Sequence, residues 1–205
     1  MKVTILGCGT SGGVPRIGNN WGACDPNEPK NRRRRCSILV EDAGSRVLID
    51  TSPDIREQLL DADVSDLDGV VWTHEHADQC HGIDELRVIA IHNRKRVEVW
   101  GDEPTLRVLK SRFDYCFKQL EGSPYPAILT DHLIEGPFTV GNIDFIPFEQ
   151  TPLGPTNKWL KPGFQKAYPI TISKTQIKIL PVSMFLATKW ETYKNRGKDP
   201  RTSHD

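Results

Sequence analysis

The chain has 205 residues, enough for one sizeable domain and short for two. Its 27 Lys and Arg balance 27 Asp and Glu, so the overall charge gives no sign of nucleic-acid binding. No apolar run approaches the ~18 residues of a membrane span, and a strand starts at once where a signal peptide would have its apolar core. Five cysteines without a C-x-x-C pair argue against a disulfide framework and favour a reducing, cytoplasmic setting.

Hydrophobic periodicity and turn residues predict alternating strands and helices. In chain order we expect a strand at 2–6, a loop over 7–35, a hairpin of strands 36–40 and 46–49, a helix at 53–61, a buried strand at 69–72, a helix at 83–93, a strand at 97–100, a helix at 104–117 and a hairpin of strands 138–140 and 143–148. Ser52 suits the N-cap of the first helix and Pro53 its first position. Beyond residue 150 the pattern weakens, and only a strand at 177–182 is expected.

The composition changes near residue 150. Residues 151–205 contain eight Lys and two Arg against two Asp and one Glu, together with six of the fifteen prolines. Residues 1–150 therefore carry 17 basic and 24 acidic residues. Two explanations stay open. A shifted reading frame or altered 3′ end would make 151–205 a foreign, poorly ordered basic tail, which we favour, whereas the rival is a divergent natural domain end.

The glycines Gly7, Gly9 and Gly12 form a G-x-G-x-x-G pattern directly after the first strand, as in dinucleotide-binding loops. Such a loop needs a helix whose N-terminus holds the pyrophosphate. Here Pro15 follows closely and the next predicted element is a hairpin, so the pattern argues against a Rossmann fold. The glycines are expected to allow either a tight turn or a close backbone approach to an active site.

The most informative stretch is HEHADQCH at residues 74–81, at the carboxyl end of the buried strand. His74 and His76 are two residues apart, so on an extended segment their side chains point to the same side. Imidazole is a common metal ligand and Asp78 adds an anionic oxygen, so the cluster predicts a metal site. The alternative is a chance polar loop or helix cap. For His81, next to Gly82, a ligand and a helix start both stay open.

This stretch resembles the H-x-H-x-D-H signature of the metallo-β-lactamase superfamily. Other segments resemble its phosphodiesterases of phosphonate breakdown, which open cyclic ribose phosphates; they read LGCGTSGGVPRIG, WGACDP, NRRRRCSILVE, LIDTSPDIREQLL and HGIDELR. The resemblance covers about residues 1–150. It implies an α/β fold, the αββα sandwich, incomplete in its C-terminal half, with 1–150 as the hydrolase region. It also implies two ions, Zn²⁺ or Mn²⁺, in a cleft near the glycine loop.

The resemblance assigns roles to the cluster. His74 and His76 would bind one ion, while Asp78 would bind the other and, as the catalytic residue, orient the water nucleophile. Where the family has a further His, this chain has Gln79. Because a carboxamide binds zinc less well than imidazole, the second ion would be held weakly, His81 would replace the missing ligand, or fewer than two ions would bind.

Three residues are expected around this centre. Asp50, at the end of the strand in LIDT, would hold a metal ligand from behind or simply cap the following turn. Arg35, from the run NRRRR, would contact a substrate phosphate, because guanidinium suits phosphate; the alternative is a solvated loop whose charges meet acids of residues 1–150. Gly12 would let the backbone approach the substrate.

The resemblance also implies later ligands that the sequence lacks. Pro152 stands about where the family has a His, no bridging Asp is found in ISKTQIKILPV, and His204 is a poor candidate for the last His. Activity of this chain is therefore in doubt, and we expect poor stability or little turnover.

The expected function is a metal-dependent hydrolase, a phosphodiesterase acting on a small cyclic phosphate or nucleotide-like ester with metal-activated water. The alternatives are a degenerate relative that binds a metal or ligand without catalysis, and an RNA-processing nuclease or amide hydrolase of the same superfamily. The expected partner is a small phosphoester substrate. No membrane partner is expected, nucleic acid ranks below the small substrate, and a homodimer stays open.

Overall fold

The computed structural model describes residues 1–147, 169–172 and 175–178. The chain divides into two compact units, Met1–Pro147 and Phe148–Asp205. In the second unit, strands β9 (Pro169–Ile172) and β10 (Thr175–Lys178) pair antiparallel. The strand expected at 177–182 overlaps the end of β10, and its remainder lies outside the described residues. β9 was not expected, because Pro169 and the surrounding lysines obscure the alternating pattern.

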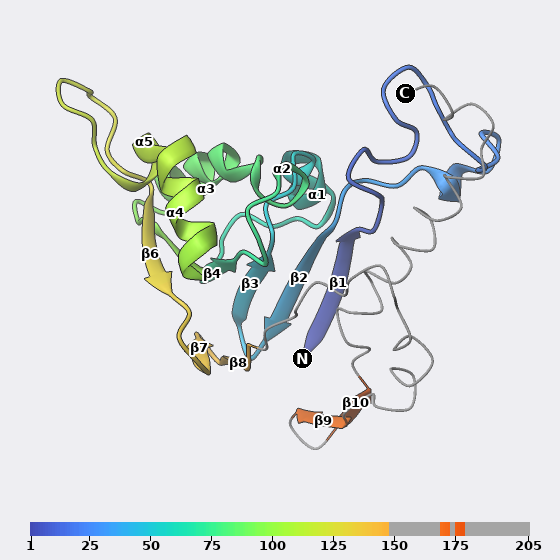
Figure 1. Cartoon of the computed structure of the whole chain (residues 1–205). Coiled ribbons are helices and arrows are strands. Elements are labelled where there is room, and N and C mark those ends of the chain that lie inside the picture. Colours follow the sequence, from blue (N-terminus) through green and yellow to red (C-terminus); the bar gives the residue numbers. More distant parts are fainter. Residues whose placement is uncertain (148–168, 173–174, 179–205) are drawn as a thin grey trace. The chain divides into compact units, whose positions relative to one another are not determined.

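The first unit is built on a six-stranded sheet with the order β1-β2-β3-β4-β5-β6 (Figure 1). Its strands are β1 (Lys2–Gly7), β2 (Ser37–Asp42), β3 (Ser45–Ile49), β4 (Gly69–Val71), β5 (Val97–Gly101) and β6 (Leu129–Leu133). The first three strands pair antiparallel and β3 to β6 run parallel. Five of the six strands were predicted. The sequence analysis missed β6, whose three central residues, Thr-Asp-His, are polar and only partly buried.

The helices begin and end at slightly different residues from those predicted. They are η1 (Pro29–Asn31), α1 (Ile55–Asp61), α2 (Ala77–Cys80), η2 (Ile83–Glu85), α3 (Leu86–His92), α4 (Glu103–Arg112) and α5 (Asp114–Phe117). The prediction of Ser52 as N-cap was wrong: the N-cap of α1 is Asp54, while the Ser52 hydroxyl accepts the Asp54 amide and donates to Gln58. The helix predicted over 104–117 is broken at Phe113, whose backbone leaves the helical region.

The two faces of the sheet pack against different partners. One face, which includes Leu39, Leu48 and Val99, forms the main core with helix residues such as Leu86 and Leu109. Figure 1 shows α1 to α5 gathered on one side of the sheet.

A small hairpin covers part of the other face. Its strands are β7 (Phe138–Val140) and β8 (Ile143–Phe145), as the sequence predicted, although β8 ends before Phe148. Val47 and Val71 of the sheet pack there against Val140 and Ile143. Successive residues of a strand point to opposite faces, so adjacent residues such as Val70 and Val71 belong to the two separate cores.

The glycine loop lacks the helix that dinucleotide binding needs. Within residues 7–35 the structure has only the single turn η1, and β1 is followed by the antiparallel β2, which excludes the Rossmann interpretation as expected. Gly7 lies so close to the backbone of Arg35 that a Cβ there would collide with the Arg35 carbonyl oxygen. Gly7 therefore allows the two backbone segments to pack closely.

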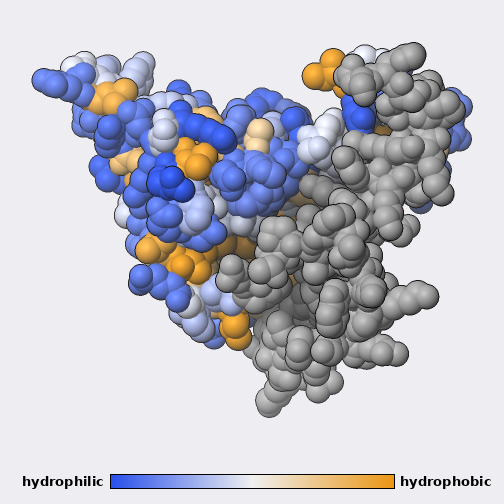
Figure 2. Space-filling view, viewed as in Figure 1, coloured by the Kyte–Doolittle hydropathy of each residue, from blue (hydrophilic) through white to orange (hydrophobic). Residues whose placement is uncertain are grey.

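The described surface is mainly polar. On the face drawn in Figure 2, hydrophobic residues form separate patches among hydrophilic ones. Exposed apolar side chains include Ile17 in the loop of residues 7–35, and Val88 and Ile91 on α3. Among the described residues, no helix is both long and apolar enough to cross a membrane.

Candidate active site

The predicted site lies where two parallel strands end side by side. Asp50 directly follows β3, and the segment of His74 follows β4. The register pairs Ile49 with Val71, and the Asp50 amide donates to the Val71 carbonyl at 2.9 Å. Ligand sites of open α/β sheets favour such carboxyl ends of strands, so the topology places Asp50 and the histidine segment where a site is expected.

A short chain of hydrogen bonds links Asp50 to the first histidine. The Asp50 carboxylate is buried and accepts the Thr73 amide at 2.8 Å and the Thr73 hydroxyl at 2.9 Å. The same hydroxyl lies 2.9 Å from Nδ1 of His74. Asp50 thus fixes Thr73, and Thr73 contacts the imidazole. The sequence analysis did not single out Thr73, because a threonine before the first histidine carries no metal-binding signal of its own.

The structure brings His74 and His76 together. Their ring centroids lie 4.7 Å apart in an edge-to-face arrangement. Asp78 lies one turn on, in α2, where its carboxylate accepts the side-chain amide of the buried Gln79 at 3.1 Å. Gln79, which stands where the resemblance implies an imidazole, therefore contacts Asp78 directly.

The described residues do not by themselves form a complete set of metal ligands. In the part of the chain that the structure describes, no group of three or more His, Cys, Asp or Glu side chains could hold a metal ion. Structural and catalytic zinc sites use at least three protein ligands. The exposed ring of His81 packs edge-on against Phe113, with centroids 5.5 Å apart. The ligand roles of His74, His76, Asp78 and His81 remain predictions.

Arg35 is held by an acidic partner from the next element. Its backbone amide and Nε donate to one oxygen of Asp54 at 2.8 and 2.9 Å, and its Nη2 donates to the other at 2.5 Å. This pairing raises the pKa of Arg35, with a further contribution from the charge of Asp78, although burial acts in the opposite direction. Arg35 therefore lies within electrostatic reach of Asp78.

The other arginines of the run also have local partners. Arg34 pairs with Asp61 at 2.6 Å, Arg33 donates to the Cys8 sulfur at 3.2 Å, and Arg32 lies over the ring of Trp21. Arg34 and Arg35 thus each pair with an acid of residues 1–150, and a contact of Arg35 with a substrate phosphate stays a prediction. The exposed Gly12 faces the side chain of Arg16, and its contact with a substrate stays a prediction.

Buried residues of the core form hydrogen bonds with the segment that carries the histidines. The buried Thr51 hydroxyl donates to the Cys80 carbonyl at 3.2 Å and accepts the Trp72 indole N–H at 2.9 Å. The Cys80 thiol donates to the Glu75 carbonyl at 3.2 Å. Burial raises the pKa of the Cys80 thiol to about 11, so the thiol stays protonated at neutral pH. Cys80 therefore packs locally within the histidine segment.

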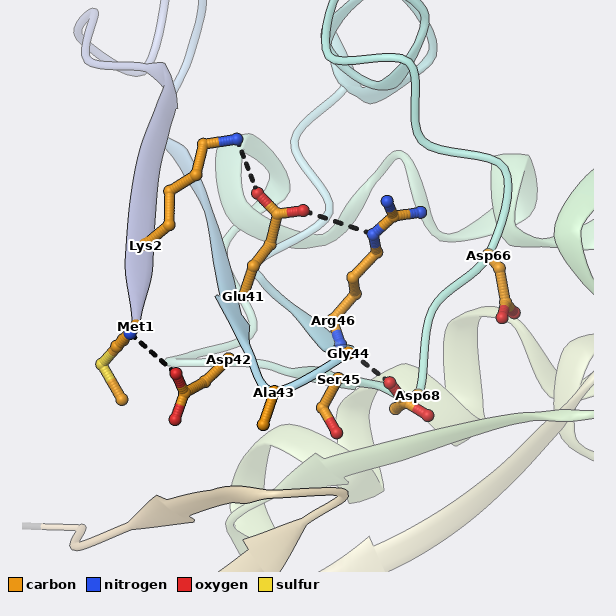
Figure 3. Close-up of a pocket in the computed structure, with 10 residues that line it drawn as sticks. All are labelled: Met1, Lys2, Glu41, Asp42, Ala43, Gly44, Ser45, Arg46, Asp66 and Asp68. Atoms are coloured by element: carbon orange, nitrogen blue, oxygen red, sulfur yellow. Dashed lines mark hydrogen bonds and ion pairs between the residues drawn. The ribbon is translucent and has the colours of Figure 1, made fainter. Parts of the chain in front are cut away.

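A separate hollow of about 450 Å³ lies at the opposite end of the sheet. Figure 3 shows its wall at the β2–β3 turn, where Lys2 and Arg46 both reach Glu41 and the Arg46 amide donates to Asp68. Ser45 begins β3 and Asp68 precedes β4, whereas the histidines follow the end of β4. The hollow therefore does not belong to the predicted site.

Comparisons with known proteins identify the family and the fold. The family described as "Beta-lactamase superfamily domain" matches residues 45–167. A solved diphosphatase of the PhnP family is 37% identical, with a TM-score of 0.62 over 71% of this chain and 55% of that one. An octanoyltransferase of Porphyromonas gingivalis is 40% identical over 127 residues, 62% of this chain and 25% of that protein. The chain thus spans about half of the first relative and a quarter of the second.

Proposed function

The chain belongs to the β-lactamase superfamily, with the metallo-β-lactamase fold, and from that premise we propose that it is a metal-dependent hydrolase of phosphodiesters. The expected α/β fold class is confirmed by the family match and by the likeness to the diphosphatase. The proposed substrate is a small cyclic phosphate or a nucleotide-like ester, and the proposed cofactor is Zn²⁺ or Mn²⁺. The proposed setting is the cytoplasm.

One observation carries this proposal: 37% identity to a protein named as a diphosphatase, combined with an H-x-H-x-D stretch at the carboxyl end of β4. The other match, an octanoyltransferase, has a name from a different class of reaction, but three quarters of that protein lie outside the match. The cluster of imidazoles and carboxylate suits hydrolysis, and the nearby Arg35 suits an anionic substrate.

The chain's own residues support part of such a site. The described residues offer two adjacent imidazoles and do not by themselves fit a metal ion, so no step of the reaction is assigned through one. The Thr73 hydroxyl, which Asp50 holds, lies at hydrogen-bond distance from Nδ1 of His74 and so favours one ring orientation. We assign Asp78 the role of orienting the attacking water and Arg35 that of contacting the phosphate.

The experiment measures metal content and turnover on the same preparation. Zinc and manganese are counted per chain, and hydrolysis of bis(p-nitrophenyl) phosphate is followed before and after chelation. His74→Ala and Asp78→Ala are expected to lower both quantities at least ten-fold. His92→Ala is the matched control, because His92 is an exposed histidine at the end of α3. The proposal would be overturned if Asp78→Ala hydrolysed the substrate as fast as wild type, or if the chelator left hydrolysis unchanged.

A second candidate function is a non-catalytic relative that binds a metal or ligand. The absence of a three-donor group among the described residues favours it. Tight binding of one zinc ion without turnover of a substrate panel would select this candidate. The panel contains a cyclic phosphate, a short RNA and a lactam, so that nuclease and amide hydrolase activities are detected as well. Gel filtration of the same sample tests for a homodimer.

A further inference from the structure

One backbone carbonyl connects helix α4 to the histidine segment. The Glu75 carbonyl oxygen accepts Nη1 of Arg112 at 3.0 Å and the thiol of Cys80 at 3.2 Å. Glu75 lies between His74 and His76, so the orientation of its peptide group affects the placement of both rings. A single acceptor with two donors, one of them charged, holds that peptide group in one orientation.

Both donors belong to elements that the core anchors: Cys80 is buried, and the exposed Arg112 ends a helix with a buried face. Arg112 ends α4, a helix capped by Asp102, whose side chain accepts the Thr105 amide at 2.9 Å. Leu109, one turn before Arg112, is fully buried. Because α4 follows β5 directly, the strand anchors the helix whose last residue, Arg112, contacts Glu75 from 37 residues along the chain.

We propose that Arg112 is a positioning residue of the site. It holds the Glu75 carbonyl, and together with Cys80 it keeps the His74–His76 segment in the arrangement in which the two rings are adjacent. The inference rests on the proposed function only in assigning these histidines to the site; the contact between α4 and the segment stands on geometry. Arg112 is not a catalytic residue, since its recorded contact is with the backbone.

Three variants test the proposal: Arg112→Ala, Arg112→Lys and, as the matched control, Arg107→Ala. Arg107 is an exposed arginine of the same helix that pairs with Glu103 instead. Hydrogen exchange is followed at the amides of Gln79 and Cys80, which bond to the His76 carbonyl. The ring signals of His74 and His76 are followed by NMR.

Arg112→Ala is expected to raise exchange at these two amides about three- to ten-fold and to shift both ring signals, while the thermal midpoint stays close to wild type. Arg112→Lys restores one charged donor and is expected to recover most of the protection. Arg107→Ala should leave the segment unchanged. Exchange and ring signals that are the same in Arg112→Ala and wild type would overturn the proposal.

Zinc affinity, measured against a competing chelator, separates this inference from the proposed function. If wild type binds zinc, Arg112→Ala is expected to weaken binding about ten-fold. If wild type binds none, the proposed function fails, while the exchange and ring measurements still decide the role of Arg112. Equal affinity of wild type and Arg112→Ala would overturn the positioning role and leave the proposed function intact.

Discussion

The Asp50 carboxylate accepts hydrogen bonds from both the amide and the hydroxyl of Thr73, which joins the segments that follow β3 and β4. Asp50 has a φ of 63°, in the left-handed region. Short side chains that bond locally, such as Asp and Asn, tolerate this region better than others. The residue therefore combines an unusual backbone conformation with two hydrogen bonds that lead toward His74.

Asp50→Ala is expected to destabilise the fold by about 2 to 3 kcal/mol, because it removes the buried carboxylate that accepts both Thr73 hydrogen bonds and puts Ala in the left-handed region. Asp50→Asn keeps one acceptor oxygen and the local backbone preference, so its loss should be about half as large. Urea unfolding measures both. Equal losses in the two variants would contradict this account, because the acceptor and the backbone preference that Asn retains would then contribute nothing.

The ion pair of Arg35 and Asp54 predicts a loss of stability in acid. Hydrogen bonds and charge from Arg35 lower the pKa of Asp54 below its ordinary value of 3.8, although burial opposes them. An acid whose pKa is lowered on folding stabilises the folded state at pH values above its ordinary pKa. This contribution is lost as the pH falls through the lowered pKa. The free energy of unfolding should therefore decline below about pH 4, and more steeply in wild type than in Asp54→Asn.

Two buried thiols predict a loss of stability in alkali. Burial raises the pKa of Cys80 and of Cys116 from 9.0 to about 11. A thiol whose pKa is raised on folding stabilises the folded state at pH values below its ordinary pKa. This contribution disappears as the pH rises through the raised pKa. Unfolding should become easier from pH 9 to about 11. At neutral pH a thiol reagent should modify the exposed Cys8 first, and reaction of Cys116 before unfolding would contradict its burial.

Gly82 is expected to tolerate no side chain. A Cβ there would collide with the Ser52 carbonyl oxygen and with Ile55, while the Gly82 amide donates to Thr51 at 2.9 Å. Gly82→Ala should cost about 2 kcal/mol or more through overpacking. Gly136→Ala is the matched control, because that glycine has open space around it. Similar thermal midpoints for the two variants would show that the close packing at Gly82 relaxes without cost.

The sequence was informative where hydrophobic periodicity and turn residues coincide. Strands β1 to β5 and the β7–β8 hairpin followed from alternation, but the polar centre of β6 conceals a strand that pairs with β5. The break at Phe113 leaves no mark in the periodicity. The Asp54 side chain makes no capping hydrogen bond to α1 and instead accepts the amide of the distant Arg35. Sequence periodicity does not record such contacts.

For the site, the spacing of His74 and His76 predicted two neighbouring rings, and the structure has them. The residues that hold these rings in place could not be predicted from the spacing of residues in the sequence. Thr73 and Arg112 carry no motif, and Arg112 reaches Glu75 only because α4 ends beside the histidine segment. Of the positions at which the resemblance implies later ligands, Pro152 and His204 lie outside the described residues, whereas the stretch 172–182 overlaps β9 and β10.

Gln79→His tests whether the predicted second ion lacks only one ligand. The resemblance places an imidazole at this position, and Gln79 instead donates its amide to Asp78 at 3.1 Å. Imidazole binds zinc better than a carboxamide, so the variant should bind zinc at least ten-fold more tightly. Gln79→Leu removes the amide without adding a ligand and serves as control. If both variants gain affinity equally, the gain comes from releasing Asp78 and not from the new imidazole; if neither gains, residue 79 does not face the ion.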